Sequence, residues 1–212
     1  MKYGTLITLL LLVPLSGIHS ALGQQAETNA KSAEFYFNSG ISVPKSHNNF
    51  AEFYDESFNV GFGIGYDLSP SFLICVELAY NNFKLDGERF IGSHENLKGN
   101  ASEGDEAIFS FTIGTKAKLS TSNDIITPYL KVNFGFMHRK YDDLYVEAFD
   151  PDTSFVLPED FDTSIMLHFG FGIDIKITKG FYLFGEAKLN HAFTKEESTQ
   201  YIPLKVGILY RR

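Results

Sequence analysis

The chain has 212 residues, of which 44% are hydrophobic and 15% aromatic, and its formal net charge is -8. An acidic balance argues against a nucleic-acid partner, because nucleic-acid binding needs clustered lysine and arginine. The single cysteine, Cys75, excludes a disulfide within the chain. The length suits one domain without a second module.

The N-terminus has the pattern of a secretory signal peptide. A lysine precedes the apolar run from Leu6 to Leu15, and Ala21-Leu22-Gly23 forms a small-residue cleavage site. The apolar run is far shorter than the roughly 20 residues that a helix needs to cross a bilayer. We therefore expect residues 1–23 to be removed and residues 24–32 to form a short polar lead-in.

A ten-residue pattern then occurs four times. In each copy, apolar residues occupy every second position around a fixed glycine. A charged residue follows, and in most copies a serine or threonine comes after it. The copies are Val60–Ser69, Phe111–Ser120, Phe169–Thr178 and a last one about Gly207 that stops at the chain end. Alternation at period two is typical of strands with two unlike faces. Four equivalent copies predict four hairpins and therefore eight strands.

The strands between the copies follow from the same alternation. They are expected at about Ala33–Val43, Phe72–Phe83, Thr127–His138 and Phe181–Phe193. When Phe72–Phe83 is aligned with Phe181–Phe193, Glu77 superposes on Glu186. This match indicates a second repeat, among the strands that run antiparallel to the four copies.

The two faces of these strands differ in bulk. One face carries no charge and is made of large residues such as Phe62 and Phe171, whereas the other carries glycines and charges such as Gly172 and Lys116. Pointed inward, the large residues would overfill an eight-stranded barrel, which is just wide enough for side chains. Pointed outward, they form a lipid-facing band. The sequence therefore predicts an all-β fold, an eight-stranded antiparallel up-and-down transmembrane β-barrel.

The connections are of two kinds. Three are tight turns, at about residues 69–71, 120–124 and 178–180, and four are longer and mostly polar, at about residues 44–56, 84–105, 139–160 and 194–200. Short periplasmic turns and long extracellular loops are the asymmetry of outer-membrane barrels. We therefore expect the bacterial outer membrane as the location, with both termini in the periplasm because the strand number is even.

Two segments carry a family resemblance. Phe184-Gly185-Glu186-Ala187 and the ending Pro203–Arg211, with the signal peptide and eight strands, resemble the outer-membrane β-barrel domain common in Bacteroidetes, often called PorT-like. The family is similar in architecture to the small barrels of the outer membrane protein A and X type. The resemblance implies a barrel domain over residues 33–212, surrounded by outer-membrane lipid and lipopolysaccharide and inserted by the barrel-assembly machinery.

Charged residues recur on the inward face and form a predicted lumen charge network. Its members are Glu34, Glu77, Glu186, Lys116, Lys131, Lys176 and Lys188. They could form a proton or ion path, or a salt-bridged plug. Eight strands leave no aqueous channel and buried charges are tolerated mainly in pairs, which favours the plug. Successive strands carry Glu77 and Lys116, so these two are expected to form the closest pair, with Lys131 within reach.

Residues 141–162 carry eight carboxylates and no lysine or arginine. Asp150 and Asp152 are weak metal candidates, because the segment around them is similar to the start of a calcium loop. The glycine and the distal glutamate that such a loop requires are absent, since Phe155 and Phe161 stand in their places. We favour a solvated acidic loop and expect no metal and no cofactor.

No catalytic constellation is evident. The histidines that follow the signal peptide have no metal-ligand spacing, and the His-x-Ser pairing of the lipid A deacylase type of small barrel is absent. We expect no enzyme. The favoured function is a structural or surface-interaction role, with long acidic extracellular loops that contact lipopolysaccharide, neighbouring proteins or host molecules. The alternatives are a conduit for small or apolar solutes and a soluble lipid-binding barrel, which detergent-free solubility would reveal.

Overall fold

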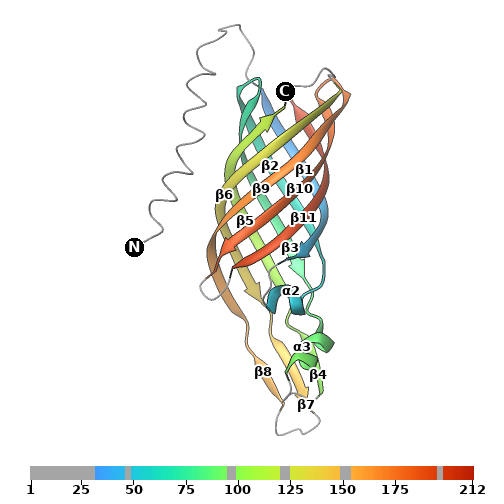
Figure 1. Ribbon diagram of the computed structural model, residues 1–212, viewed down its shortest axis with the longest axis vertical. Helices are drawn as coiled ribbons and strands as arrows, with labels where there is room; N and C mark the ends of the chain where they lie inside the picture. Colours follow the sequence, from blue (N-terminus) through green and yellow to red (C-terminus); the bar gives the residue numbers. More distant parts are fainter. Residues whose placement is uncertain (1–31, 46–48, 95–98, 120–124, 149–153, 195–197) are drawn as a thin grey trace, which may run out of the picture. The chain divides into compact units, whose positions relative to one another are not determined.

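The chain forms a closed β-barrel. The computed structural model describes residues 32–45, 49–94, 99–119, 125–148, 154–194 and 198–212. Eight antiparallel strands close in the order β1-β11-β10-β9-β6-β5-β3-β2 (Figure 1). The predicted fold class is therefore confirmed. The expected signal peptide and all but the last residue of the expected lead-in lie outside the described residues, as do Asp150 and Asp152.

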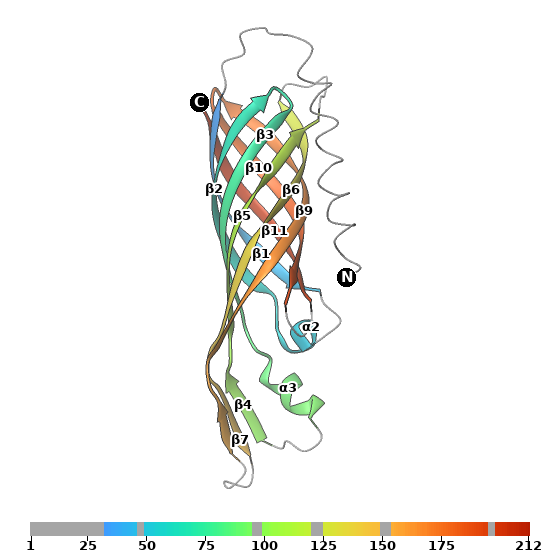
Figure 2. The ribbon, with the colours of Figure 1, turned by 90° about the vertical axis from the view of Figure 1, so that its left-hand side faces the viewer.

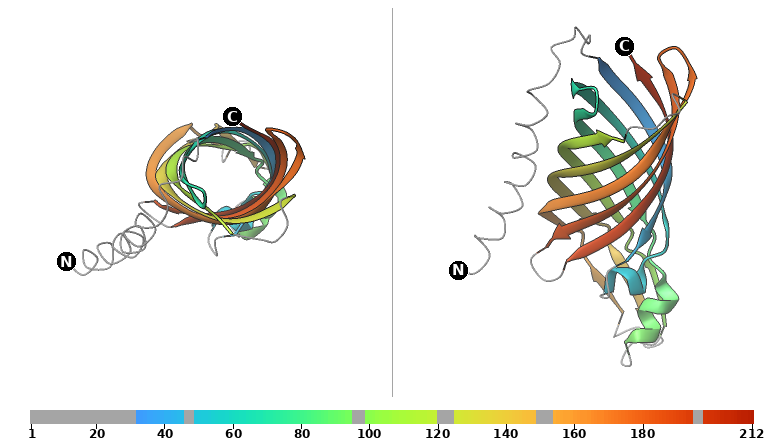
Figure 3. Two further views of the ribbon diagram at one scale, coloured as in Figure 1. Left: turned by 90° about the horizontal axis from the view of Figure 1, so that it is seen from above. Right: turned by 45° about the horizontal axis from the view of Figure 1, so that its top comes forward.

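The barrel strands agree closely with the alternation of the sequence. They are β1 Ala33–Pro44, β2 Ser57–Ser69, β3 Phe72–Phe83, β5 Glu106–Lys118, β6 Ile126–Tyr141, β9 Asp160–Thr178, β10 Phe181–Phe193 and β11 Thr199–Arg211. The first strand closes the ring, because Phe37 has Phe62 of β2 on one side and Ile208 of β11 on the other. Seen from above, the strands form a continuous wall (Figure 3).

The outer face is apolar and the inner face is not. Along β2, Phe58, Phe62 and Leu68 are exposed, whereas the intervening Asn59 is buried. From Phe58 to Leu68 the strand advances by about 33 Å at roughly 3.3 Å per residue. A tilt of about 40° reduces this to a height of about 25 Å, which is the height of the apolar band on membrane barrels.

The two ends of the barrel differ (Figure 2). At the turn end, β2 joins β3 and β9 joins β10 through tight turns, and the Ala33 amide donates to the Arg212 carbonyl at 3.2 Å. Gly180 has φ +85, a conformation that glycine adopts without strain in such a turn. The opposite end, here called the loop end, carries the helices α2 (Asn49–Phe53) and α3 (Gly87–Ser93). The expected turn at residues 120–124 lies outside the described residues.

The loop end also contains a small sheet that the sequence analysis missed. Its strands, β4 (Gly99–Glu103), β7 (Leu144–Ala148) and β8 (Phe155–Leu157), lie in the order β4-β7-β8. The Gly104 amide donates to the Asp143 carbonyl at 2.9 Å, which continues the β5–β6 pairing beyond the barrel. Thus parts of two segments expected to be polar loops are folded. Among the described residues, no helix is both long and apolar enough to cross a membrane.

Candidate functional site

The interior of the barrel is the candidate site, because most of the buried charged side chains gather there. Two charged clusters are stacked along the barrel and are separated by an aromatic layer. We call them the turn-end cluster and the central cluster. The turn-end cluster contains Glu34, Asp67, Lys116, Lys118, Asp174 and Arg211. The central cluster contains Glu77, Lys131, Glu186, Lys188 and Lys205.

The turn-end cluster is centred on Glu34. Its Oε1 lies 3.0 Å from Lys118 Nζ and 2.5 Å from the Arg211 guanidinium. Lys116 Nζ donates to Asp174 Oδ2 at 2.7 Å and lies 3.5 Å from Glu34 Oε2. Barrel closure makes the cluster possible, because it places Glu34 directly beside Arg211 in the β1–β11 register. With Asp67 included, three carboxylates face three cations, so the cluster is balanced.

The central cluster is centred on Glu77, which binds three lysines from three other strands. Its Oε1 accepts from Lys188 at 2.5 Å and from Lys205 at 2.9 Å, and its Oε2 accepts from Lys131 at 2.7 Å. Glu186 lies 3.0 Å from Lys188 and 3.4 Å from Lys131. Buried charges persist when they are paired in this way.

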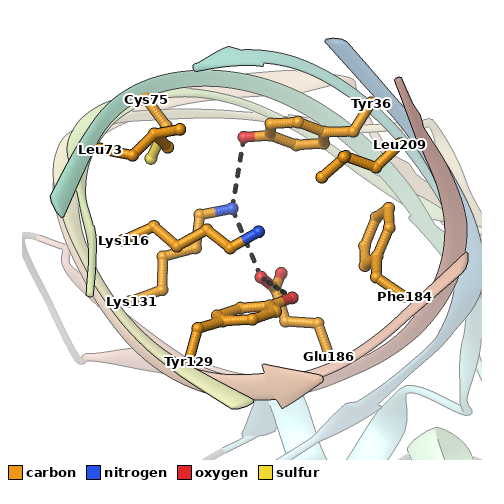
Figure 4. Close-up of a pocket in the computed structure, with 9 residues that line it drawn as sticks. All are labelled: Tyr36, Leu73, Cys75, Lys116, Tyr129, Lys131, Phe184, Glu186 and Leu209. Carbon is orange, nitrogen blue, oxygen red and sulfur yellow. Dashed lines mark hydrogen bonds and ion pairs between the residues drawn. The ribbon is translucent and has the colours of Figure 1, made fainter. Parts of the chain in front are cut away.

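An aromatic layer lies between the two clusters, and Figure 4 shows the small cavity that its rings line. The cavity measures about 10 Å³. Lys116 Nζ lies 4.1 Å from the centroid of the Tyr129 ring, and Lys131 Nζ lies 4.8 Å from that of Tyr36. The cavity is lined by Tyr36, Leu73, Cys75, Lys116, Tyr129, Lys131, Phe184, Glu186 and Leu209.

The tyrosines of this layer cover two of the four fixed glycines of the repeat. Tyr36 lies opposite Gly63 in the strand register, and Tyr129 lies opposite Gly172. A Cβ at Gly63 would approach the Tyr36 ring to 2.1 Å, and one at Gly172 would approach the Tyr129 ring to 2.5 Å. The glycine is therefore required at these two positions because an aromatic ring of the neighbouring strand covers it.

Gly172→Ala should destabilise the barrel by about 1–3 kcal/mol, because the added methyl overpacks the layer. The matched control is Gly185→Ala on the neighbouring strand, where an added Cβ would meet no atom within 4 Å. Urea unfolding of both variants in lipid vesicles measures the difference. Equal stability of the two variants would show that the ring does not enforce the glycine.

Asparagines form a layer on the loop-end side of the central cluster. Asn59 Nδ2 donates to Ser42 Oγ at 3.0 Å, and Ser42 Oγ donates to Asn81 Oδ1 at 2.7 Å. Asn38, Asn133 and Asn190 are also buried inside the barrel. These asparagines occupy positions that the alternation assigns to the inward face. Nothing in the sequence indicated that they would lie close together.

An apolar cap closes the interior at the loop end. Phe50 of α2 is 5% exposed, and its ring centroid lies 4.9 Å from that of Phe83. The remaining buried members are Ile108, Met137, Met166, Ala192 and Tyr201. From the sequence we expected glycines and charges on the inward face and did not predict this apolar cap. The inward phase turns apolar near the loop end, where α2 folds over it.

A second feature that the sequence analysis missed lies beside the cap. The Arg139 guanidinium donates to both oxygens of Glu106, at 2.6 and 2.9 Å, and also to Thr199 Oγ1 at 2.8 Å. The Tyr54 hydroxyl donates to the Gly104 carbonyl at 3.2 Å, and burial raises the pKa of Tyr54. The loop end is thus held by polar contacts around an apolar centre.

The structure places six of the seven predicted network residues inside the barrel, and the seventh prediction is wrong. The six are Glu34, Glu77, Glu186, Lys116, Lys131 and Lys188. Lys176 is exposed and makes no ion pair within the described ranges. The strand register shifts between Phe181 and Tyr182, directly beside Lys176, and interrupts the inward alternation.

The predicted pairing of Glu77 with Lys116 is also wrong. In the β3–β5 register, Glu77 lies opposite Thr112 and Lys116 lies opposite Leu73. The two charged residues are therefore four positions apart, about 13 Å along the strands. Lys116 reaches the turn-end cluster instead, while its neighbour Lys131 reaches Glu77.

The metal candidates remain untested, because Asp150 and Asp152 lie outside the described residues. In the part of the chain that the structure describes, no group of three or more His, Cys, Asp and Glu side chains is placed to hold a metal ion.

A closed eight-stranded barrel with an apolar outer band and a polar, packed interior defines the class of small outer-membrane β-barrels. The sequence matches the family described as "Outer membrane protein beta-barrel domain" over residues 10–211. The chain belongs to this family, whose members lie in the bacterial outer membrane. No curated protein matches the sequence.

Solved structures share the fold at low sequence identity. Neisserial surface protein A is 14% identical with a TM-score of 0.58, and the match covers 86% of this chain and 99% of that one. OprG from Pseudomonas aeruginosa is 12% identical with a TM-score of 0.53, covering 86% and 97%. Ail from Yersinia pestis, in complex with the heparin analogue sucrose octasulfate, is 12% identical with a TM-score of 0.51, covering 86% and 99%.

Proposed function

We propose that this outer-membrane barrel has a structural or surface-interaction role, that side chains plug its interior, and that it has no catalytic activity. The loop end faces outward and both termini face the periplasm. The asymmetry between tight turns and long loops supports this orientation. The segments Phe184–Ala187 and Pro203–Arg211 support a place in the Bacteroidetes, PorT-like branch of the family.

The stacked interior supports the plug. Two ion-pair clusters, an aromatic layer, an asparagine layer and an apolar cap follow one another along the barrel. The cavity between the charged clusters, about 10 Å³, is far too small for an organic molecule. The alternative function, a conduit for small or apolar solutes, would require most of these layers to move.

The small sheet at the loop end carries the interaction proposal. Its strand β8 is an edge strand, and Phe155, Val156 and Leu157 are all more than a third exposed. An open edge with exposed apolar residues is a ready template for pairing with another chain. Such an edge is costly to maintain in water without a partner, so we infer that it binds one.

The charge near this sheet restricts the kind of partner. A shallow pocket is lined by five carboxylates and one lysine: Glu103, Asp105, Lys140, Asp142, Asp143 and Glu159. Ail is seen with a sulfated heparin analogue. An acidic rim repels such a polyanion, so we propose a protein partner, from the same envelope or from a host, rather than a sulfated glycan. The apolar outer wall supports contact with outer-membrane lipid and lipopolysaccharide.

A single-cysteine experiment tests both orientation and interaction. In a Cys75→Ser background, Val156→Cys should react with a membrane-impermeant maleimide on intact cells, whereas Lys179→Cys in a turn-end loop should not. When the maleimide carries a photoreactive arm, Val156→Cys should also give a discrete cross-linked adduct. Labelling of Lys179→Cys alone would reverse the orientation. Labelling of Val156→Cys without any adduct would overturn the interaction role.

A further inference from the structure

The central cluster contains one more positive charge than negative charge. Lys131, Lys188 and Lys205 face only Glu77 and Glu186, and all five side chains are at most 3% exposed. An uncompensated charge in a buried site is strongly unfavourable.

No neighbouring group in the described interior removes this surplus. The turn-end cluster pairs three carboxylates with three cations, and Glu106 is bound to Arg139. The Tyr129 hydroxyl donates to Glu186 at 3.1 Å and so acts there as a neutral donor. The described barrel interior as a whole therefore keeps one positive charge in excess.

The small cavity lies between the two charged clusters and is lined by two lysines and by the Glu186 carboxylate, which pairs with Lys131 and Lys188. Lys116 and Lys131 both extend into it with their ammonium groups (Figure 4). The Tyr36 hydroxyl, which accepts from Lys131 at 3.3 Å, also points into it and keeps its own proton for a further acceptor. A volume of about 10 Å³ suits one guest of about the size of a water molecule.

We propose that this cavity binds one halide ion, which would be chloride in the cell. A monatomic anion accepts from Lys116, from the Tyr36 hydroxyl and from Lys131, where it replaces the long 3.4 Å contact to Glu186, and it neutralises the surplus charge. Sulfate and phosphate are too large for the space. A water molecule would fill the cavity but would leave the buried charge uncompensated. The proposal goes beyond the proposed function and does not depend on it, since the site is inside the barrel and far from β8.

The experiment uses the full barrel folded in detergent, with gluconate exchanged for chloride or bromide at constant ionic strength. Halide should lower the unfolding equilibrium constant by about a hundredfold when its concentration is 100 times its dissociation constant. Lys205→Met balances the central cluster and should abolish this dependence. The matched control, Lys140→Met, changes a lysine outside the barrel interior and should preserve it.

Crystals grown in bromide provide a direct readout. A bromide peak between Lys116, Lys131 and Tyr36 is expected. Absence of the peak together with equal stability in gluconate and halide would overturn the proposal, and the surplus charge would then be removed by loss of a lysine proton. A halide dependence that persists in Lys205→Met would place the ion elsewhere and would also overturn it. Should Lys205→Met fail to fold, the bromide peak in the wild-type protein decides.

Discussion

Glu77→Gln should lower the free energy of unfolding by about 3–5 kcal/mol, because it leaves buried lysines without their shared carboxylate. Glu77 accepts from Lys131, Lys188 and Lys205, and these contacts join four strands of the barrel. The substitution nearly preserves the shape of the side chain, so the loss reflects charge rather than packing. Urea unfolding of the barrel in lipid vesicles measures it.

The comparison with Lys205→Met makes this prediction specific. Lys205 contacts only Glu77 within the central cluster, and its removal brings two lysines to face two glutamates. Lys205→Met should therefore cost much less than Glu77→Gln, although both remove the same ion pair. If both variants lose the same free energy of unfolding, the excess positive charge does not affect the stability of the barrel.

Phe171→Arg should cost about 2–4 kcal/mol, which is the range for arginine at the bilayer midplane of a transmembrane barrel. Phe171 is 66% exposed and lies midway between Ile165 and Ile177, two exposed apolar residues of β9. The introduced charge would therefore face lipid at its deepest point. The same unfolding measurement in vesicles gives the loss.

Phe155→Arg is the control, since Phe155 is also an exposed phenylalanine but lies on the small loop-end sheet. There the introduced charge meets water and should change stability little. If both arginine variants fold into vesicles as the wild type does, the outer band of the barrel does not contact lipid.

The strands and their outward faces were predictable because both depend on local alternation. Strands β3 and β10 have the predicted bounds, and Phe62 and Phe171 point outward as predicted. A charged residue on the outward face would contact lipid, which is costly. The alternation of apolar and polar residues along each strand is therefore strictly constrained. No knowledge of the barrel's closure is needed to recognise that pattern.

The pairing of the interior charges was not predictable from the sequence. Glu77 binds Lys188 and Lys205, which lie 111 and 128 residues away. Such contacts cross the lumen, and they depend on the stagger of all eight strands and on the direction in which each long side chain leans. Reasoning from successive strands therefore joined Glu77 to Lys116, although the strand register separates them.

The loop-end sheet was missed for a different reason. Leu144 and Val146 alternate and are buried, but the acidic residues around them indicated a solvated loop. Strands as short as β7 and β8 contain too few alternating positions to be recognised. The negative charge of the segment therefore led to the prediction of a solvated loop. The exposed apolar residues of β8 were also present in the sequence, within the same acidic segment.

Ion conductance across a planar lipid bilayer tests the central claim, that side chains plug this membrane barrel, most directly. The wild-type barrel, reconstituted as a single species, should give no stable conductance above that of the bare bilayer, because two charged clusters and an apolar cap fill its interior. A stable, well-defined conductance step of the wild-type protein would contradict the plug and establish the conduit in its place.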